Sequence, residues 1–331
     1  MATIQKRGNS YRIRKMINGK VYSLTLDYKP RQSEADKLLY ALTDAETATS
    51  RTLSFQKAAE NYIASKDSIL SPSTVREYRS QLRTMPSDFV KRPVAGISCS
   101  DVQILINDYS RSHSPKSVRN LSGFVSVVMV SVRPNWRNSV SLPQKRAVSF
   151  YVPEKSDVKR ILEAVKGTSY ELPLWLACFG LRRSEIIALE RSDLEGNTIS
   201  INKALVLDED RKWVLKSTKT TASTRKIIVS DYVASLIRSC SEGRLYRGHP
   251  GQINEHLEAV EKELGSEKFS LHKLRHFFAS TARETMPDIY VEKAGGWKAG
   301  SQIMRKVYDY AQREESKKAQ EALASHLSDI L

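Results

Sequence analysis

Two short polar segments, residues 47–51 and 142–146, interrupt the apolar patterning of this sequence. The chain has 331 residues, which is more than one ordinary hydrophobic core organises, so two or three domains are expected. The polar segments stand where the connections between such domains would lie. We therefore predict a multidomain protein with domains at residues 1–50, 52–143 and 147–331.

The first domain is predicted to be a small α+β module. Polar and apolar residues alternate over residues 11–16 and 21–26, and Asn18-Gly19 between them is typical of a two-residue hairpin turn. We expect a hairpin or three-stranded sheet, followed by a helix at about residues 33–45. Basic side chains on the hairpin suit a DNA groove, although a solvated charged hairpin would have the same pattern. The side chains predicted to contact DNA here are Arg12, Arg14, Lys15 and Lys20.

The second domain is predicted to be all-helical. The segments Ser71-Pro72, Ser98-Cys99-Ser100-Asp101 and Ser114-Pro115 are helix start signals, and apolar residues recur at helical spacing after each. With a helix at residues 55–67, this makes four. No constellation that could catalyse a reaction is apparent, which favours a binding module or a scaffold. The predicted phosphate contacts, each of which could equally be an ordinary surface cation, are Arg76, Arg79, Lys116 and Arg119.

The balance of charge indicates a polyanionic partner. The chain carries 53 Lys and Arg against 37 Asp and Glu, a formal net charge of +16. This excess favours binding to DNA or RNA, although a merely basic protein is the alternative. The cysteines, Cys99, Cys178 and Cys240, fit neither a disulfide framework nor a metal site, and no apolar run approaches membrane-spanning length. We expect a protein of the cytoplasm.

The third domain is predicted to be mainly α with a small antiparallel sheet. Its apolar segments have helical spacing at both ends of the domain, and short alternating segments lie between them. We expect helices at residues 154–166, 171–179, 184–190, 230–239, 251–264, 271–284 and 288–294, and strands at residues 198–202, 213–216 and 225–229.

One helix of this domain has the most informative pattern. Leu271, Leu274 and Phe278 form an apolar stripe with a period of 3.6 residues, so His272 and Arg275 project side by side from the remaining face. A histidine moves a proton near neutral pH, and a guanidinium forks onto phosphate oxygens.

Two turn segments carry basic candidates that are weak when each is taken alone. Arg182 lies beside the free N–H groups at the start of a predicted helix, where an anion can be held, but it could instead pair with Glu185. Lys219 lies in a basic, hydroxyl-rich tip at residues 216–225, which could reach a phosphate or be a solvated turn. Arg225, at the end of this tip, is predicted to contact DNA.

The remaining candidates follow the histidine helix. Trp297 comes after Gly295-Gly296, which fits a helix stop, and it is either a core residue or an N–H donor to an anion. Tyr308 and Tyr310 end a predicted helix, and either could be a packing residue or a nucleophile.

Taken in order, these candidates resemble the motifs of tyrosine recombinases, the phage and integrative-element integrase family. Five segments carry the resemblance: GLRRSEIIAL at 180–189 resembles the first arginine box, TKT at 218–220 with Arg225 the lysine segment, LHKLRH at 271–276 the H-x-L-R-H box, GGW at 295–297 the G-H or G-W position, and VY at 307–308 the terminal V-Y. The gap between Trp297 and Tyr308 is one residue longer than in many relatives. The V-Y pattern favours Tyr308 over Tyr310.

The resemblance implies DNA cleavage by transesterification, without ATP, cofactor or metal. No cluster of Asp and Glu that could hold two metal ions appears around these motifs. Tryptophan cannot share a proton, unlike the histidine that is more common at that position, which leaves Trp297 a positioning role. The implied roles are attack by Tyr308 to give a 3′-phosphotyrosine, clamping of phosphate oxygens by Arg182 and Arg275, proton acceptance or phosphate bracing by His272, protonation of the leaving 5′-oxygen by Lys219, and an N–H bond from Trp297.

The resemblance also implies how such an enzyme assembles. The three domains would be an arm-binding module, a core-binding domain and a catalytic domain, acting as a homotetramer on two paired double-stranded DNA sites. An excisionase or directionality factor and a host DNA-bending protein are possible partners. The tail at residues 314–331 is predicted to be an amphipathic helix, which could pack on its own domain or on a neighbouring protomer. The rival hypotheses are a DNA-binding regulator that no longer cuts and an enzyme like type IB topoisomerases.

Overall fold

The computed structural model describes residues 1–17, 19–145, 151–217 and 224–328. The chain forms two compact units, Met1–Ala147 with Asp208–Arg211, and Val148–Leu207 with Lys212–Leu331. The first unit holds two separate hydrophobic cores, one within residues 2–39 and one within residues 55–136. The three-domain division proposed from the sequence therefore corresponds to two units, the first of which has two cores.

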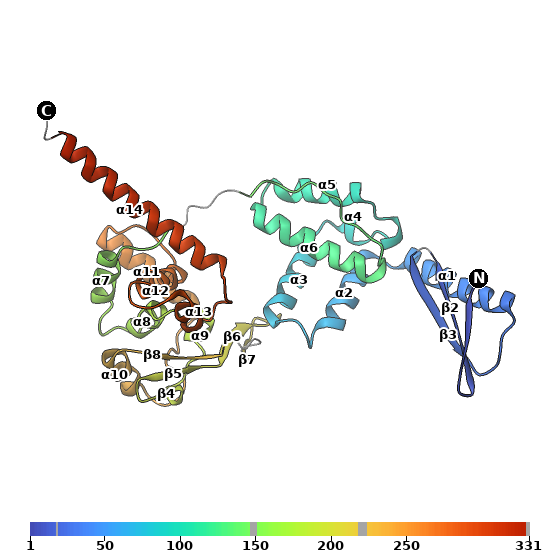
Figure 1. Ribbon diagram of the computed structural model, residues 1–331, viewed down its shortest axis with the longest axis horizontal. Helices are drawn as coiled ribbons and strands as arrows, with labels where there is room; N and C mark the ends of the chain where they lie inside the picture. Colours follow the sequence, from blue (N-terminus) through green and yellow to red (C-terminus); the bar gives the residue numbers. More distant parts are fainter. Residues whose placement is uncertain (18, 146–150, 218–223, 329–331) are drawn as a thin grey trace. The chain divides into compact units, whose positions relative to one another are not determined.

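The N-terminal module is a three-stranded antiparallel sheet covered on one face by a helix (Figure 1). Strands β1 (Thr3–Arg7), β2 (Ser10–Ile17) and β3 (Lys20–Leu26) pair in that order. Helix α1 (Gln32–Thr52) packs on β2 and β3, with Ile13 and Leu39 fully buried between them. The predicted hairpin and helix are confirmed, and β1 adds the third strand. The helix continues through residues 47–51, where the sequence predicts a linker, because this polar segment contains neither Gly nor Pro to end it.

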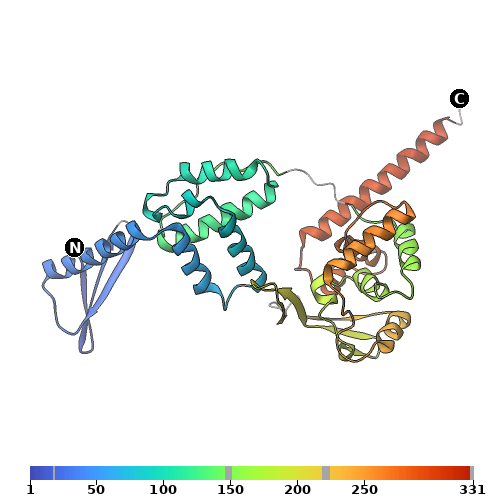
Figure 2. The same cartoon turned by 180° about the vertical axis from the view of Figure 1, so that it is seen from behind.

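Residues 55–132 form the helical part of the first unit, coloured cyan to green in Figure 2. All four predicted helices are present, and three begin at serines that accept a backbone N–H bond. Helix α4 and the short 3₁₀ turn η1 were not predicted. The elements are α2 (Phe55–Lys66), α3 (Pro72–Thr84), α4 (Ser87–Val90), η1 (Val94–Gly96), α5 (Cys99–Ser110) and α6 (Pro115–Val132).

The second unit is mainly helical, with two small antiparallel sheets of order β4-β5-β8 and β6-β7. The predicted strands are confirmed, and β4 and β6 are additional. Its first elements are α7 (Lys155–Ala164), α8 (Glu171–Cys178), α9 (Arg183–Ile186), η2 (Arg191–Asp193), β4 (Leu194–Glu195), β5 (Thr198–Ile201), β6 (Lys203–Leu207), β7 (Trp213–Ser217) and β8 (Arg225–Ile228). Then come α10 (Asp231–Ser239), α11 (Pro250–Leu264), α12 (Leu271–Ala282), α13 (Asp288–Gly295) and α14 (Gln302–Ser328).

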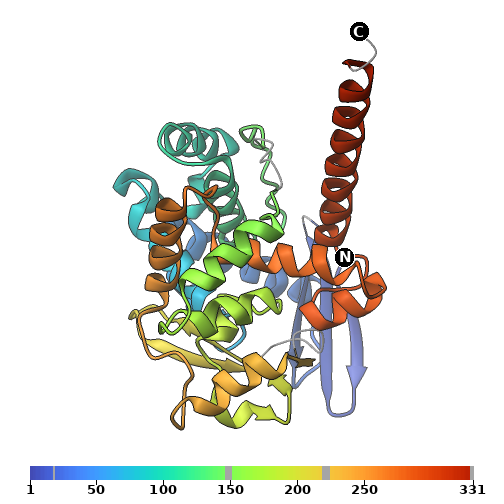
Figure 3. The ribbon, with the colours of Figure 1, turned by 90° about the vertical axis from the view of Figure 1, so that its left-hand side faces the viewer.

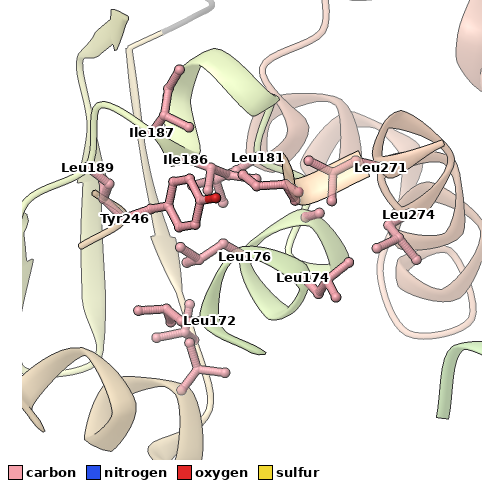
Figure 4. Close-up of a cluster of buried hydrophobic side chains, with 14 of the residues drawn as sticks. Leu172, Leu174, Leu176, Leu181, Ile186, Ile187, Leu189, Tyr246, Leu271 and Leu274 are labelled. Atoms are coloured by element: carbon pink, nitrogen blue, oxygen red, sulfur yellow. The ribbon is translucent and has the colours of Figure 1, made fainter. Parts of the chain in front are cut away.

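The main core of this unit surrounds the apolar helix α8 (Figure 4). Leu174 and Leu176 of α8 are buried beside Leu271 and Leu274 of α12. The predicted apolar stripe of α12 therefore anchors this helix in the core, and fixes the direction in which its other side chains project.

The last helix, α14, is one continuous element in which Tyr308 lies in the second turn and the tail follows without a break (Figure 3). The sequence predicts two separate segments here. In the tail Ala319, Ala322 and Leu323 are exposed, and the exposed fraction of Leu323 is 58%. Among the described residues, no helix is both long and apolar enough to cross a membrane.

A buried carboxyl joins α11 to the segment that leads into α12. Glu261 is 1% exposed, and its Oε1 accepts the N–H of Phe269 at 3.2 Å. No described residue donates to its Oε2. Burial is the main cause that raises the pKa of Glu261 to about 7; Glu258 adds to this, whereas the Phe269 N–H and Lys268 oppose it.

Glu261 should therefore make the free energy of unfolding depend on pH. The unfolded carboxyl ionises near pH 4.5, but the folded one stays protonated until about pH 7. The resulting stability is fully present below pH 4.5 and is lost as the pH rises to 7, because the unfolded state then loses its proton first. Relative to Glu261→Gln, the wild type should lose about 3 kcal/mol over this range. Urea unfolding at several pH values measures this, and a constant difference between the two proteins would contradict it.

Candidate active site

Three segments of the second unit bring the predicted motifs together. They are the turn between α8 and α9, the helix α12, and the turn between α13 and α14. Arg182 and Arg275 come from the first two, and Trp297 from the third. Hydrogen bonds and a cation–π contact connect all three segments.

The turn between α8 and α9 depends on Gly180. This residue has φ of +83°, and a Cβ atom there would lie 2.7 Å from Cδ1 of Phe278 on α12. Only glycine meets both conditions without a shift of the backbone. The Gly180 carbonyl, turned toward α12, accepts a hydrogen bond from Nη1 of Arg275.

Arg275 is a buried cation with an unused donor. Arg275 is 1% exposed, and its guanidinium lies 4.1 Å from the centre of the Trp297 ring. No described residue accepts a hydrogen bond from Nη2. Burial, followed by the positive charge of Arg182, lowers the pKa of Arg275 below its ordinary value. The sequence predicts an arginine facing outward, whereas the structure buries it with one donor available to an anion.

Arg182 stands at the start of α9 and is only partly covered. Its Nη1 donates to Oε1 of Glu185 at 2.7 Å, and its Nη2 donates to the Gly296 carbonyl at 2.9 Å. The side chain remains 35% exposed. The ion pair with Glu185 is therefore present, and it orients a guanidinium that still faces solvent. The contact of Arg182 with an anion stays a prediction.

Glu185 and Arg225 form a buried layer beneath Arg182. Arg225 donates from Nη2 to Glu185 at 2.9 Å and from Nε to the Ala294 carbonyl at 2.6 Å. Burial favours the neutral form of Glu185, but the bonds and charges of Arg225 and Arg182 outweigh it and lower the pKa of the carboxyl. Arg225 is 7% exposed, so its predicted DNA contact is not supported by its position. The sequence signal for this layer was the R-x-x-E spacing of residues 182–185.

His272 projects from α12 at the surface of the site. Its ring centre lies 5.2 Å from that of His276, one turn further along the helix. Partial burial and the positive charges of Arg275 and Arg182 lower the pKa of His272 below 6.5. The imidazole is therefore neutral at pH 7 and able to accept a proton.

Trp297 is 8% exposed and belongs to a small core with Phe278, Met304 and Val307. Its ring is the platform on which the Arg275 guanidinium lies. An added Cβ at Gly295 would come within 2.1 Å of this ring, which explains the glycine before the helix stop. Its predicted N–H bond to phosphate stays a prediction.

Of the predicted catalytic groups, Tyr308 is described only in part and Lys219 not at all. The backbone of Tyr308 is in α14, but its side chain, like the whole of Lys219, lies outside the described residues. The hydroxyl of Tyr310 donates to the Val152 carbonyl at 3.4 Å, which gives that residue a packing role. This contact favours Tyr308 over Tyr310 as the nucleophile.

The predicted DNA contacts of the sheet divide by face. Arg12 and Arg14 lie on the face that α1 leaves open. Lys15 lies on the other face, where its Nζ is 2.5 Å from Asp36 of α1, so the geometry does not support a DNA contact for Lys15. The Lys20 side chain lies outside the described residues.

In the helical part of the first unit, Lys116 is exposed and Arg76 is half-buried. Arg79 forms an ion pair with Glu209, and Arg119 donates to the Pro143 carbonyl at 2.7 Å. These bonds give Arg79 and Arg119 structural partners, which leaves Lys116 as the more available cation.

As for metal ligands, the described part of the chain has no group of three or more His, Cys, Asp or Glu side chains placed to hold an ion.

A buried arginine with an unused donor, a second arginine and a histidine lie together in the second unit, and Tyr308 lies on α14. Such a set of groups suits chemistry on a phosphate. Residues 153–315 match the family model described as the phage integrase family. Residues 153–315 belong to this family, and the chain is a site-specific tyrosine recombinase.

Solved structures show the same fold. The chain matches the Tn1549 transposon integrase, residues 82–397, in complex with transposon right end DNA, with a TM-score of 0.65 and 14% identity over 81% of this chain and 100% of that one. It matches a lambda integrase tetramer bound to a Holliday junction with a TM-score of 0.58 and 14% identity, over 92% and 94% of the two chains. No curated protein matches the sequence. The predicted fold class is thereby confirmed.

Proposed function

We propose that this recombinase cuts and rejoins DNA through a 3′-phosphotyrosine at Tyr308, and so integrates, and also excises, a mobile element. The observation that carries the proposal is the buried Nη2 of Arg275, to which no described residue offers an acceptor. Leaving such a donor unsatisfied costs about 1–3 kcal/mol, and more when it is charged. A nonbridging oxygen of a phosphodiester would remove this cost.

The chemistry follows from the charges of the site. The Tyr308 oxygen attacks phosphorus, its proton passes to His272, and the bond from phosphorus to the 5′-oxygen breaks. Arg182 and Arg275 hold the nonbridging oxygens, on which negative charge accumulates. Lys219 gives a proton to the 5′-oxygen. Attack of a 5′-hydroxyl on the phosphotyrosine reverses these transfers and rejoins the strand, so no ATP is consumed.

The substrate in this proposal is double-stranded DNA with core-type and arm-type sites. The open face of the β1–β3 sheet, with Arg12 and Arg14, supports arm-type binding, and the net charge of +16 supports a polyanionic partner. Lys116, Arg76, Arg79 and Arg119 stay candidate contacts for core DNA, although the last two already have protein partners.

The proposed assembly is a tetramer on two paired sites, which the lambda integrase tetramer on a Holliday junction supports by analogy. The exposed apolar residues of the α14 tail, such as Leu323, favour docking of this tail on a neighbouring protomer. An excisionase and a host DNA-bending protein would set the direction of the reaction. The site of action is the cytoplasm of a bacterial host, where its DNA lies.

The proposal is tested by trapping and mapping the covalent link. The full chain is incubated with a nicked suicide DNA site, with and without a chelator. The adduct is then digested with trypsin, and the linked residue is identified by mass spectrometry. We expect a chelator-resistant adduct on Tyr308 and a free 5′-hydroxyl on the DNA. A link to Tyr310, or no adduct at all, would overturn the proposal.

His272 should set the acid side of the pH profile of cleavage. The base must be neutral, so the rate should fall as the pH drops through the pKa of His272, which lies below 6.5. His272→Gln should cleave more slowly, by about 10²- to 10⁴-fold, and should lose this acid limb. Single-turnover rates between pH 5 and 8 measure both effects, and an unchanged limb in the variant would exclude His272 as the base.

A further inference from the structure

The turn between α13 and α14 connects the arginine cluster to the helix that carries Tyr308. Tyr308 lies in the second turn of α14, only a few residues after this connection ends. A helix is stiff over such a length, so the position of its first residues sets the position of the Tyr308 backbone. Whatever fixes the turn therefore fixes the nucleophile relative to the phosphate.

Glu292 of α13 holds this turn at both of its ends. The backbone carbonyl of Glu292 accepts the N–H of Trp297 at 2.8 Å. Its carboxylate accepts the N–H of Ser301 at 2.9 Å and that of Gly300 at 3.3 Å. The residue is 8% exposed, so these bonds form where water competes little.

The location of the carboxylate suits the start of a helix. Gly300 and Ser301 directly precede α14, whose first N–H groups have no partner within the helix. A negative charge there is also favoured by the helix dipole. Gly300 has φ of +68°, a conformation that turns the chain so that both N–H groups face Glu292.

The other side of the same turn is bonded to the arginines. Arg225 donates to the Ala294 carbonyl at 2.6 Å, and Arg182 donates to the Gly296 carbonyl at 2.9 Å. The turn is thus bonded to Arg182, which is proposed to hold the phosphate, and the end of α13 is bonded to Arg225 beneath it. Through Glu292, the same turn is bonded to the start of the nucleophile helix.

We propose that Glu292 is a positioning residue for cleavage, which sets the distance between Tyr308 and the phosphate held by Arg182 and Arg275. This rests on the proposed role of Tyr308. Glu292 does not touch the substrate. It acts through the backbone of Gly300 and Ser301, which distinguishes it from the side chains that bind or protonate the DNA.

The test compares Glu292→Ala and Glu292→Gln with Glu263→Ala, which changes an exposed glutamate of α11. Hydrogen exchange of the peptide around residues 298–304 is measured without DNA. Single-turnover cleavage is measured on two suicide sites, one with an ordinary phosphate and one with sulfur as the bridging 5′-atom. A thiolate leaves without a proton, so the second site removes any need for Lys219.

We expect faster exchange and cleavage slowed about 10- to 100-fold in Glu292→Ala, because small misplacements of reacting groups have effects of this size. The cleavage rate should fall by the same factor on both suicide DNA sites, and DNA affinity should be unchanged. Glu292→Gln keeps one acceptor oxygen, so its exchange and cleavage rates should lie between those of Glu292→Ala and the wild type. This variant also tests the inference if Glu292→Ala does not fold. Glu263→Ala should match the wild type in every measurement.

Two results would overturn the inference. Faster exchange with unchanged cleavage would show that the turn does not position the nucleophile. A loss that disappears on the sulfur site would place the effect on the leaving group. Failure of the proposed function is recognised separately, because the wild-type adduct would then map to a residue other than Tyr308 whatever the Glu292 variants do.

Discussion

Arg275→Ala is expected to slow DNA cleavage by about 10²- to 10³-fold, the effect of removing one donor from a developing oxyanion. Arg275 is 1% exposed and lies on the Trp297 ring, so it is fixed before the substrate arrives. Because this cation is buried, it can reach a single phosphate and adds little to the binding of a long duplex. DNA affinity should therefore change much less than the rate. Single-turnover cleavage and equilibrium binding at one salt concentration separate the two effects.

A matched control for Arg275→Ala is Arg183→Ala. Arg183 is an exposed arginine beside Arg182, and its loss removes the same charge from the same unit. We expect it to change the cleavage rate by less than a few-fold, as for ordinary surface cations. Arg275→Lys should be nearly as slow as alanine, because an ammonium cannot bond the Gly180 carbonyl and present a second donor in the plane of a guanidinium. Equal losses in affinity and rate for Arg275→Ala would refute this role.

The sequence predicted the local structure around the site where local patterning decides that structure. The apolar stripe of α12 and the glycine at a helix stop follow from periodicity and backbone freedom, and both are confirmed at Leu271, Leu274 and Gly296. The start of α5 at Ser98 is another such case, since its capping box with Asp101 is entirely local.

What the sequence could not predict are pairings between distant segments. Nothing near Arg225 indicates that it reaches Glu185 on another element, so a buried ion pair resembled a surface cation. The ion pair of Lys15 was missed for a similar reason, because its partner Asp36 lies on α1. Alternation assigns a side chain to one face of a strand, but which face the helix covers depends on tertiary packing.

Glu185→Gln is expected to lower the free energy of unfolding by about 3–5 kcal/mol, the size of effect seen when one partner of a buried ion pair is removed. Glu185 is 3% exposed and is bonded to Arg225 and Arg182, with Arg275 nearby. Its loss leaves three guanidinium groups close together without this negative charge. A suitable control is Glu163→Gln on α7, whose ion pair with Lys159 is exposed and should contribute less than about 1 kcal/mol.

A double variant tests the same role of Glu185. Changing Arg225 to Met in the Glu185→Gln background removes one of the unpaired charges, so it should recover part of the lost stability.

The deficit of Glu185→Gln, which is its loss in free energy of unfolding relative to the wild type, should also shrink in acid. The pKa of Glu185 is lowered in the folded protein, so its contribution is present above the unfolded value of about 4.5 and is lost as the pH falls through the folded value. Urea unfolding of the four proteins at pH 7 and at pH 4 measures these effects. A deficit no larger than that of Glu163→Gln, or one that grows in acid, would mean that Glu185 does not neutralise the arginine cluster.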